Sequence, residues 1–242
     1  MRFDLPRDRI FEIQEIDVRL DPGPHPFFEG AEEAVAARWQ MERAAKPALF
    51  DGEVVLLSRL EWADGRLSGT CHAVRYSQFL YWRSQRPVES AEHAYAHPIL
   101  VAGDNALVAI RMASHTINAG QVYFASGSFE PVDFPGGRVD VDLNMRREAL
   151  EEIGIDLRDC VAEPRLFGLS RPEGTVFFRR YFSTLPAYKL AAHIRHHAEN
   201  GGDDEIEDAV ILRSPADLTD RAARQMPPLV EWHFSNGPVS EA

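Results

Sequence analysis

Residues 143–155 constrain the fold most, because they divide between two faces of a helix. At about 100° per residue, Glu148, Glu151 and Glu152 fall within about 100° of arc on one side. The roughly opposite side is apolar, with Leu143, Ala149, Leu150 and Ile153. Gly154 then supplies a residue type that commonly terminates helices. The pattern predicts an amphipathic helix over 143–153 with a core face and an acidic face.

The acidic face of this helix calls for a compensating cation. Like charges at i,i+3 and i,i+4 each cost a few tenths of a kcal/mol, and Arg147 beside Glu151 offsets only part of that cost. Hard divalent cations such as Mg²⁺ take carboxylate and carbonyl oxygens, so three glutamates suit them better than they suit Zn²⁺ or copper. For a glutamate-rich helix taken alone, a solvated acidic face is the commoner outcome, so both interpretations stand at this point.

Composition narrows the classes of function. Of 242 residues, 45% are apolar, which is enough for a sizeable core and excludes general disorder. The 26 basic and 38 acidic residues leave a net charge of −12, which repels a phosphate backbone, so we expect no nucleic-acid partner. No run approaches the ~18 apolar residues that span a bilayer, so we expect no membrane partner. Cys71 and Cys160 form no CxxC pair, which favours neither a disulfide framework nor a thiolate zinc site and is typical of a cytoplasmic protein.

Strand and helix patterns alternate along the chain without a repeat, which predicts an α+β fold. Two hairpins are predicted, from 53–62 and 66–76 around Asp64-Gly65 and from 97–103 and 106–112 around Asp104-Asn105. The other predicted elements are strands at 9–20, 120–126, 164–170, 175–184 and 206–213 and helices at 31–45, 143–153, 188–199 and 215–225. We expect a β-rich N-terminal portion over 1–95 and a larger α/β domain over 96–242.

The sequence from Arg147 to Ile155 is Arg-Glu-Ala-Leu-Glu-Glu-Ile-Gly-Ile. Its seven specified positions should coincide by chance in well under about one chain in a thousand. The segment resembles the signature of the Nudix hydrolase superfamily, whose core is RE-apolar-x-EE-x-G-apolar. The resemblance implies a Nudix-type α/β/α sandwich with a mixed sheet, preceded here by the β-rich portion.

The upstream half of the signature departs from the family pattern, in which a Gly, five residues, a Glu and seven further residues precede the arginine. Gly127 keeps the five-residue spacing to Asp133, but thirteen residues then precede Arg147. Gly137 would instead lie only ten positions before Arg147, four too few. A loop insertion is thermodynamically mild, whereas a deletion would remove backbone that the metal loop needs. We therefore start the motif at Gly127 and place an insertion in 134–146, with Pro135-Gly-Gly137 as its turn.

The resemblance also implies roles for individual residues. Glu151 and Glu152 would ligate Mg²⁺ or Mn²⁺, the backbone carbonyl of Gly127 would add a ligand, and Glu148 would bind metal or orient water. Arg147 would be structural and would pair with an acid such as Asp133. Glu148 and Glu152 are thus the catalytic candidates on the helix.

A second acidic stretch, residues 201–208, precedes an apolar strand. In Nudix enzymes that act on larger diphosphates, a glutamate on a comparable late loop can complete the metal site or act as general base. Glu205 and Glu207 are therefore further catalytic candidates, and an exposed acidic loop is the equally weighted alternative.

Three other features could contact a substrate. Arg111, at the end of a predicted strand, could bind phosphate oxygens bidentately, or it could form a surface salt bridge. Tyr76 opens an aromatic run over 76–82 that could stack on a nucleobase, although such a run is more often helix core. His193, His196 and His197 have a spacing that could hold a metal, but HExxH is not matched and we expect a solvated polar face.

The activity implied by the resemblance is hydrolysis of a nucleoside diphosphate linked to another moiety, of the NDP-sugar or ADP-ribose type. The products would be a nucleoside monophosphate and a phosphorylated partner, and the cofactor would be Mg²⁺ or Mn²⁺. Short motifs such as Phe50-Asp-Gly52 and Tyr76-Ser-Gln-Phe79 look like the subgroup related to UDP-sugar diphosphatases. The alternative is a catalytically weak Nudix-like nucleotide-binding or regulatory module, because Asp133 replaces the expected Glu and the loop is longer.

Overall fold

Strands and helices alternate along the chain in the computed structural model, which describes residues 2–172, 174–202 and 204–237. The chain forms two compact units, and both are discontinuous in sequence. The first comprises residues 1–95, 128–141 and 167–177, and the second comprises 96–127, 142–166 and 178–242. Helices and strands are both substantial and the sheets are mixed, which confirms the predicted α+β class.

The first unit is built on a four-stranded sheet of order β1-β4-β5-β3. Its strands are β1 (Phe3–Asp4), β3 (Glu15–Asp21), β4 (Glu53–Ala63) and β5 (Arg66–Arg75). β4 and β5 form the predicted antiparallel hairpin, and Asp64 and Gly65 both have positive φ at its tip, as a tight reversal requires. β3 pairs with β5 in parallel and β1 pairs with β4 in parallel, so the sheet is mixed.

The predicted strand over 9–20 is two strands, β2 (Ile10–Ile13) and β3. The chain breaks at Gln14 because the backbone N–H groups of Gln14 and Glu15 both donate to the carbonyl of Gly65, at 2.8 and 3.2 Å. β2 then pairs with β10 (Leu166–Arg171) in the second sheet. The residues with one alternating pattern therefore form two strands that belong to different sheets.

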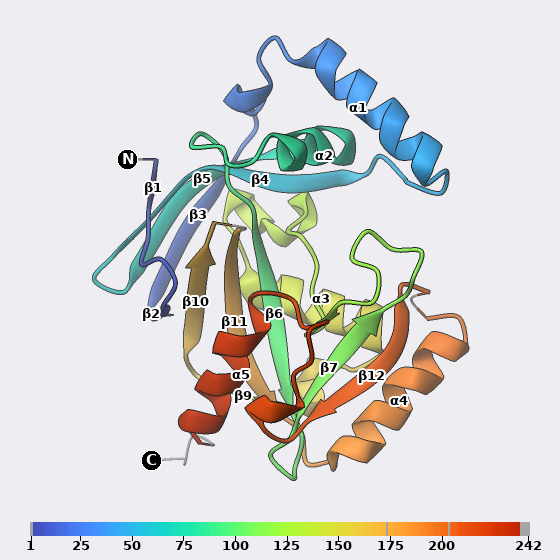
Figure 1. Cartoon of the computed structure of the whole chain (residues 1–242). Coiled ribbons are helices and arrows are strands. Elements are labelled where there is room, and N and C mark those ends of the chain that lie inside the picture. The colour runs from blue at the N-terminus through green and yellow to red at the C-terminus, as the bar shows by residue number, and fades with distance from the viewer. Residues whose placement is uncertain (1, 173, 203, 238–242) are drawn as a thin grey trace. The chain divides into compact units, whose positions relative to one another are not determined.

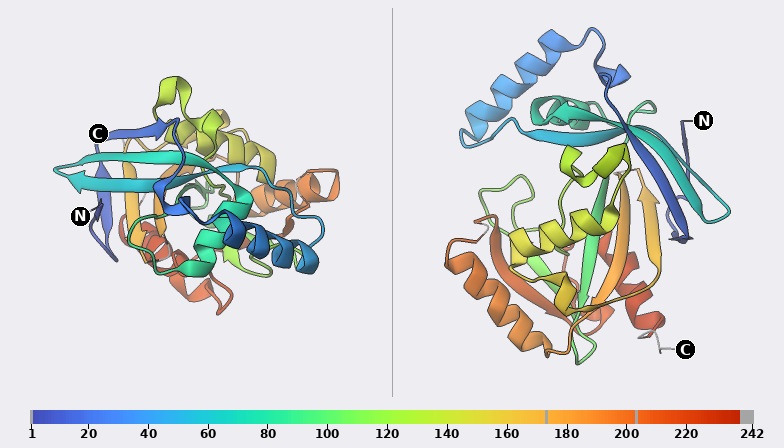
Figure 2. Two further views of the ribbon diagram at one scale, coloured as in Figure 1. Left: turned by 90° about the horizontal axis from the view of Figure 1, so that it is seen from above. Right: turned by 180° about the vertical axis from the view of Figure 1, so that it is seen from behind.

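Two helices accompany the first unit, α1 (Glu32–Ala45) and α2 (Tyr76–Gln85). In Figures 1 and 2, α2 lies between α1 and β4, in agreement with its contacts to α1, β4 and β5. Phe79 and Trp82 of α2 are buried, so the aromatic run is helix core at these positions. A short 3₁₀ turn at Pro26–Phe28 precedes α1.

The second unit contains the strand order β12-β7-β6-β11. These strands are β6 (Ala94–Val101), β7 (Leu107–Met112), β11 (Gly174–Phe182) and β12 (Ile206–Leu212), with β6 and β11 starting in the first unit. Antiparallel pairing of β6 with β7 confirms the second predicted hairpin, and β12 pairs antiparallel with β7. Two short strands, β8 (Val122–Tyr123) and β9 (Val161–Ala162), pair with β7 and β11.

Three helices belong largely to the second unit: α3 (Val141–Ile153), α4 (Ala187–Glu199) and α5 (Met226–Ser235). α3 and α4 confirm the predicted helices, and Figure 1 shows α4 alongside β12 and β7, which it contacts. The predicted helix over 215–225 is wrong, because Asp217 folds back to accept the N–H groups of Arg213 and Ser214 in a 3₁₀ turn. The helix begins at Met226 instead, with two prolines in its first turn, where backbone N–H groups need no helical acceptor.

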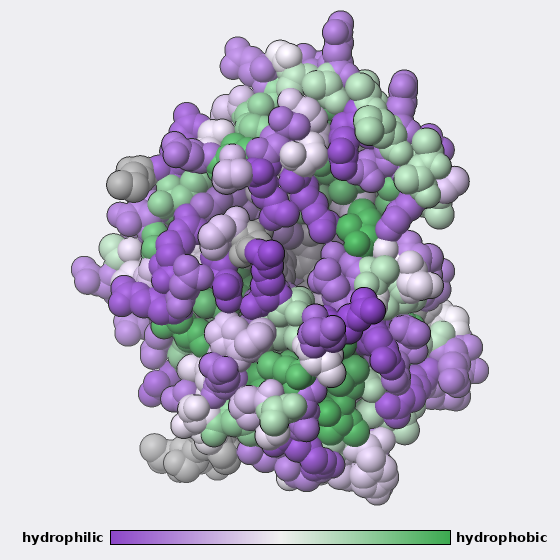
Figure 3. Space-filling model, viewed as in Figure 1, coloured by the Kyte–Doolittle hydropathy of each residue, from purple (hydrophilic) through white to green (hydrophobic). Residues whose placement is uncertain are grey.

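The face of the molecule seen in Figure 3 is mostly hydrophilic, with smaller hydrophobic patches. The exposed large hydrophobic side chains are dispersed along the chain: Met41, Phe50, Val132, Leu150, Val161, Leu185 and Tyr188. Single side chains of this kind are ordinary on protein surfaces and identify no docking face. None of the helices in the described residues is both long enough and apolar enough to cross a membrane.

Candidate functional site

The glutamates of α3 do not all lie on one exposed face. The buried side of the helix carries Val141, Asn144, Met145, Glu148, Ala149, Glu152 and Ile153. Glu148 and Glu152 are each 7% exposed, whereas Leu150 is 51% exposed. The predicted core position of Leu150 is therefore wrong, and two glutamates stand where a purely apolar stripe was expected. Glu151 alone points outward, with 59% of its side chain exposed.

The two buried glutamates lie one helical turn apart and meet the backbone of Ser126 and Gly127, where the motif starts. A carboxylate oxygen of Glu152 accepts the backbone N–H of Ser126 at 2.7 Å. A Cβ atom added to Gly127 would lie 2.1 Å from the Glu148 carboxyl carbon. Only glycine therefore lets this backbone approach the carboxylate so closely. The structure brings Gly127, Glu148 and Glu152 together and leaves the side chain of Glu151 exposed.

Residues 125–127 leave the sheet to make this approach. A strand was predicted over 120–126, but β8 includes only Val122 and Tyr123. The Val122 N–H donates to the carbonyl of Arg221 at 2.9 Å, and the Ser126 N–H donates to Glu152. The pairing of β8 therefore ends early, because the Glu152 side chain accepts the Ser126 N–H that a longer strand would donate to its neighbour.

Arg147 extends across two of the glutamates. Its guanidinium lies 2.7 Å from a Glu148 carboxylate oxygen and 3.1 Å from one of Glu151. The expected Arg147–Glu151 pair is thus present, and Arg147 also offsets the charge of Glu148. Asp133 lies in the other compact unit, where its buried carboxylate accepts the Glu130 N–H at 2.9 Å. The predicted pairing of Arg147 with Asp133 stays a prediction.

Gly154 ends α3 as predicted. It has a φ of +66°, and its N–H donates to the carbonyl of Leu150 at 3.2 Å. The Ile155 N–H donates to the carbonyl of Ala149, also at 3.2 Å. These two bonds form the left-handed termination that favours glycine.

The segment assigned to an insertion, residues 134–146, contains a turn and the first part of α3. Pro135–Gly137 form a 3₁₀ turn in which Gly136 and Gly137 both have positive φ, which confirms the predicted turn. Val139 then donates its N–H to the carbonyl of Val18 in β3 at 3.0 Å. The insertion is thereby attached to the edge of the first unit's sheet.

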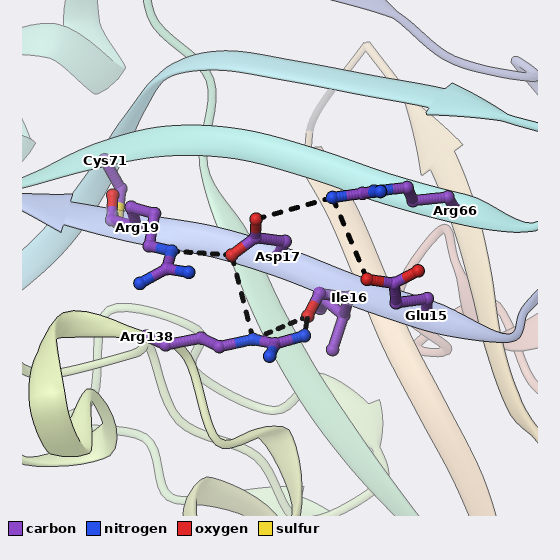
Figure 4. A network of polar contacts seen from close by, with 7 residues as sticks. All are labelled: Glu15, Ile16, Asp17, Arg19, Arg66, Cys71 and Arg138. Atoms are coloured by element: carbon purple, nitrogen blue, oxygen red, sulfur yellow. Dashed lines mark hydrogen bonds and ion pairs between the residues drawn. The ribbon is translucent and has the colours of Figure 1, made fainter.

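Arg138 adds polar and charged contacts to the same strand, β3 (Figure 4). Its guanidinium donates twice to the carbonyl of Ile16, and its Nε lies 3.7 Å from the carboxylate of Asp17. Arg19 Nε donates a hydrogen bond to the same carboxylate at 2.6 Å, and this bond lowers the pKa of Asp17 below its usual range. Arg66 lies 3.6 Å from the same carboxylate, which thus contacts three arginines from segments far apart in the sequence.

The late acidic stretch engages Arg111. Asp208 accepts hydrogen bonds from Arg111 at 2.5 Å and from Arg195 at 2.6 Å, and Glu207 lies 3.4 Å from Arg111. Burial acts to raise the pKa of Asp208, but the Arg195 hydrogen bond and the two positive charges outweigh it, and the pKa is lowered. Arg111 therefore forms the surface salt bridge that was one of its two predicted roles. A contact of Arg111 with phosphate stays a prediction. Sequence reasoning did not single out Asp208.

The roles predicted for Glu205 and Tyr76 stay predictions. Glu205 is exposed, and its carbonyl accepts the Ala113 N–H at 2.7 Å beside β12. Tyr76, at the start of α2, stacks on Phe79 with ring centroids 5.8 Å apart and planes 17° apart. Tyr76 belongs to the first unit, whereas Arg111 and the glutamates of α3 belong to the second.

The donor set on α3 suits a hard divalent cation chemically. Among the residues that the structure describes, no three His, Cys, Asp or Glu side chains gather closely enough to hold a metal by themselves. Mg²⁺ does not need such a cage, because it is usually bound by one or two carboxylates, waters and substrate phosphates. Glu148 and Glu152 beside the Gly127 backbone supply oxygen donors of this kind.

No protein-family model matches the sequence, and no curated protein matches it. Among solved structures, the chain is similar to a protein of Deinococcus radiodurans at 14% identity, with a TM-score of 0.44 over 62% of this chain and 89% of that one. A MutT protein from Methanosarcina mazei Go1 is similar at 12% identity and a TM-score of 0.39, over 60% and 94% of the two chains. An Ap4A hydrolase from C. elegans is similar at 12% identity and a TM-score of 0.41, over 59% and 96%.

Proposed function

We propose that the chain is a Mg²⁺- or Mn²⁺-dependent pyrophosphohydrolase of the Nudix type. Its substrate would be a nucleoside diphosphate joined to a sugar or similar group, of the NDP-sugar or ADP-ribose class. The observation that carries the proposal is the burial of Glu148 and Glu152, one turn apart, against the Ser126–Gly127 backbone. Two carboxylates held beside a backbone carbonyl supply the oxygen donors that hard divalent cations prefer, so this arrangement favours a cation-binding role.

The roles proposed for the residues are those that the resemblance to the Nudix signature implies. Glu151, Glu152 and the Gly127 carbonyl would hold the cation, and Glu148 would add a ligand or orient the attacking water. When bound, the divalent cation neutralises charge on the two bridged phosphates and favours deprotonation of a water. Arg147 keeps Glu148 and Glu151 from repelling each other before the cation arrives. Glu205 and Glu207 would supply the general base, with Arg111 and Tyr76 as substrate contacts.

The proposal is tested by incubating the protein and Mg²⁺ with UDP-sugars, ADP-ribose, dinucleoside polyphosphates and nucleoside triphosphates in ¹⁸O-labelled water. We expect a nucleoside monophosphate and a phosphorylated partner, with the label in one product phosphate. Glu152→Gln should lower turnover about 100-fold or more. Glu33→Gln, which changes an exposed glutamate of α1, is the matched control and should act like the wild type.

Two results would count against the proposal. Absence of phosphate-ester release from every member of the panel would contradict hydrolysis. Full activity in Glu152→Gln would contradict the assignment of the site to α3. Nucleotide binding by calorimetry without turnover would instead favour the non-hydrolysing module that the altered upstream motif suggests.

A further inference from the structure

The C-terminal end of α3 is held by imidazoles from α4. His197 Nε2 lies 2.9 Å from the carbonyl oxygen of Glu151, and His193 Nε2 lies 2.8 Å from that of Gly154. Because a carbonyl oxygen only accepts, each Nε2 carries a proton and donates it. The last carbonyls of a helix lack helical partners, so these two bonds satisfy groups that the fold would otherwise leave to water.

The His197 ring is enclosed by two glycines. A Cβ atom on Gly154 would lie 2.6 Å from the ring Nδ1, and one on Gly202 would lie 2.5 Å from the ring Cδ2. The Gly202 N–H also donates to the His197 carbonyl at 3.0 Å. Any larger residue at either position would push the ring away from the carbonyl of Glu151.

His196 provides the contrast on the same helix. Its ring is exposed, and its Nδ1 lies 3.0 Å from the side-chain amide of Asn200, one turn further along α4. The predicted solvated polar face therefore fits His196. His193 is exposed as well, but its ring and that of His197 also donate to carbonyls at the end of α3.

We infer that His197, supported by His193, is a positioning residue for the cation site on α3. The residue whose carbonyl it holds lies between Glu148 and Glu152 in the final turn of that helix. A donor to this carbonyl opposes fraying of the final turn of α3, from which the Glu152 carboxylate reaches the Ser126 N–H. Partners that orient ligand-bearing groups commonly change metal affinity or activity about 10- to 100-fold when removed. The inference rests on the proposed function, because it takes Glu148 and Glu152 as cation ligands.

The test measures Mn²⁺ binding directly, from the electron paramagnetic resonance signal of free Mn²⁺ titrated with protein and no nucleotide. His197→Leu removes the donor at similar bulk and should weaken Mn²⁺ affinity about 10-fold or more. His197→Gln returns an N–H donor near the Nε2 position and should restore affinity to within about threefold of wild type. His196→Leu removes a neighbouring imidazole that does not touch α3 and should bind as wild type.

Two controls separate the possible outcomes. Thermal melting without metal reports whether each variant folds. Gly202→Ala, which crowds the His197 ring and its backbone carbonyl but keeps the imidazole, replaces His197→Leu if that variant does not fold. Wild-type affinity in His197→Leu, together with lost affinity in Glu152→Gln, would overturn the inference alone. Equal binding, or none, in wild type and Glu152→Gln would overturn the proposed function and the inference with it.

Discussion

The carboxylate of Glu152 accepts the backbone N–H of Ser126 at 2.7 Å, across 26 positions of sequence. This bond joins the final turn of α3 to the residue before Gly127. It gives a buried carboxylate a fixed orientation, and it leaves Ser126 dependent on a helix side chain for its acceptor.

Two substitutions of Glu152 should distinguish the effect of its charge on stability from the effect of its hydrogen bond. Glu152→Gln keeps an oxygen that accepts from Ser126, so the free energy of unfolding without metal should change little. Glu152→Ala leaves that part-buried donor without its acceptor and should cost about 1 to 3 kcal/mol. Urea unfolding of both variants in a metal chelator checks the prediction. Equal stability of the two variants would show that the bond does not support the fold.

Alanine at Gly127 should damage the site by steric contact. The added Cβ would lie 2.1 Å from the Glu148 carboxyl group, so the carboxylate or the loop must move. We expect a loss of about 1 to 3 kcal/mol in stability and a fall in turnover. Gly52→Ala is the matched control, because its Cβ would meet only the Phe50 ring at 3.4 Å. Similar behaviour of the two variants would contradict the close approach.

The buried pair of Arg180 and Glu163 should dominate the electrostatic stability of the second unit. Two hydrogen bonds of 2.8 Å join them, and both side chains are 2% exposed. Arg180→Gln leaves the Glu163 charge buried without its partner and should cost about 3 to 5 kcal/mol. Arg158→Gln breaks an exposed pair with Asp156 and should cost far less, because solvent screens this pair. Urea unfolding at neutral pH compares the two, and a similar loss in both would contradict the ranking.

Acid should destabilise the fold through buried histidines. Burial lowers the pKa of His97 from 6.5 to about 4, and His97 Nε2 lies 3.3 Å from the Gln225 side-chain nitrogen, from which only the neutral ring can accept. The folded pKa is below the unfolded one, so this contribution is present above about pH 6.5 and is lost as the pH falls toward 4. Burial also lowers the pKa of His25 to about 4 and that of His93 to about 3.

Replacing the titratable ring of His97 should make the free energy of unfolding less dependent on pH. His97→Gln should reduce the fall in unfolding free energy over the same window by up to about 3 kcal/mol. Urea titrations at several pH values check the slope, with His196→Gln as an exposed control. A slope that is unchanged in His97→Gln would show that His97 titrates in the folded protein as it does in the unfolded chain.

Local chemistry determined the elements of this protein. Positive φ at Asp64 and Gly65 closes the first hairpin, and Gly154 stops α3, because these residue types tolerate backbone conformations that others resist. The spacing of Glu148, Glu151 and Glu152 likewise follows from helical periodicity alone. Such features depend on neighbours a few residues away, so the amino-acid order is sufficient to predict them.

Tertiary structure decided which way the helix faces. Periodicity fixes which residues share a side of α3, but the side that is buried depends on what packs there. Ser126 and Arg147 supply partners that make buried carboxylates tolerable, and Leu150 is left exposed. His197 reaches Glu151 across 46 positions, and the glycines that admit its ring are distant from each other in sequence. A contact between remote segments has no local signature, because its free energy exists only once the chain has folded.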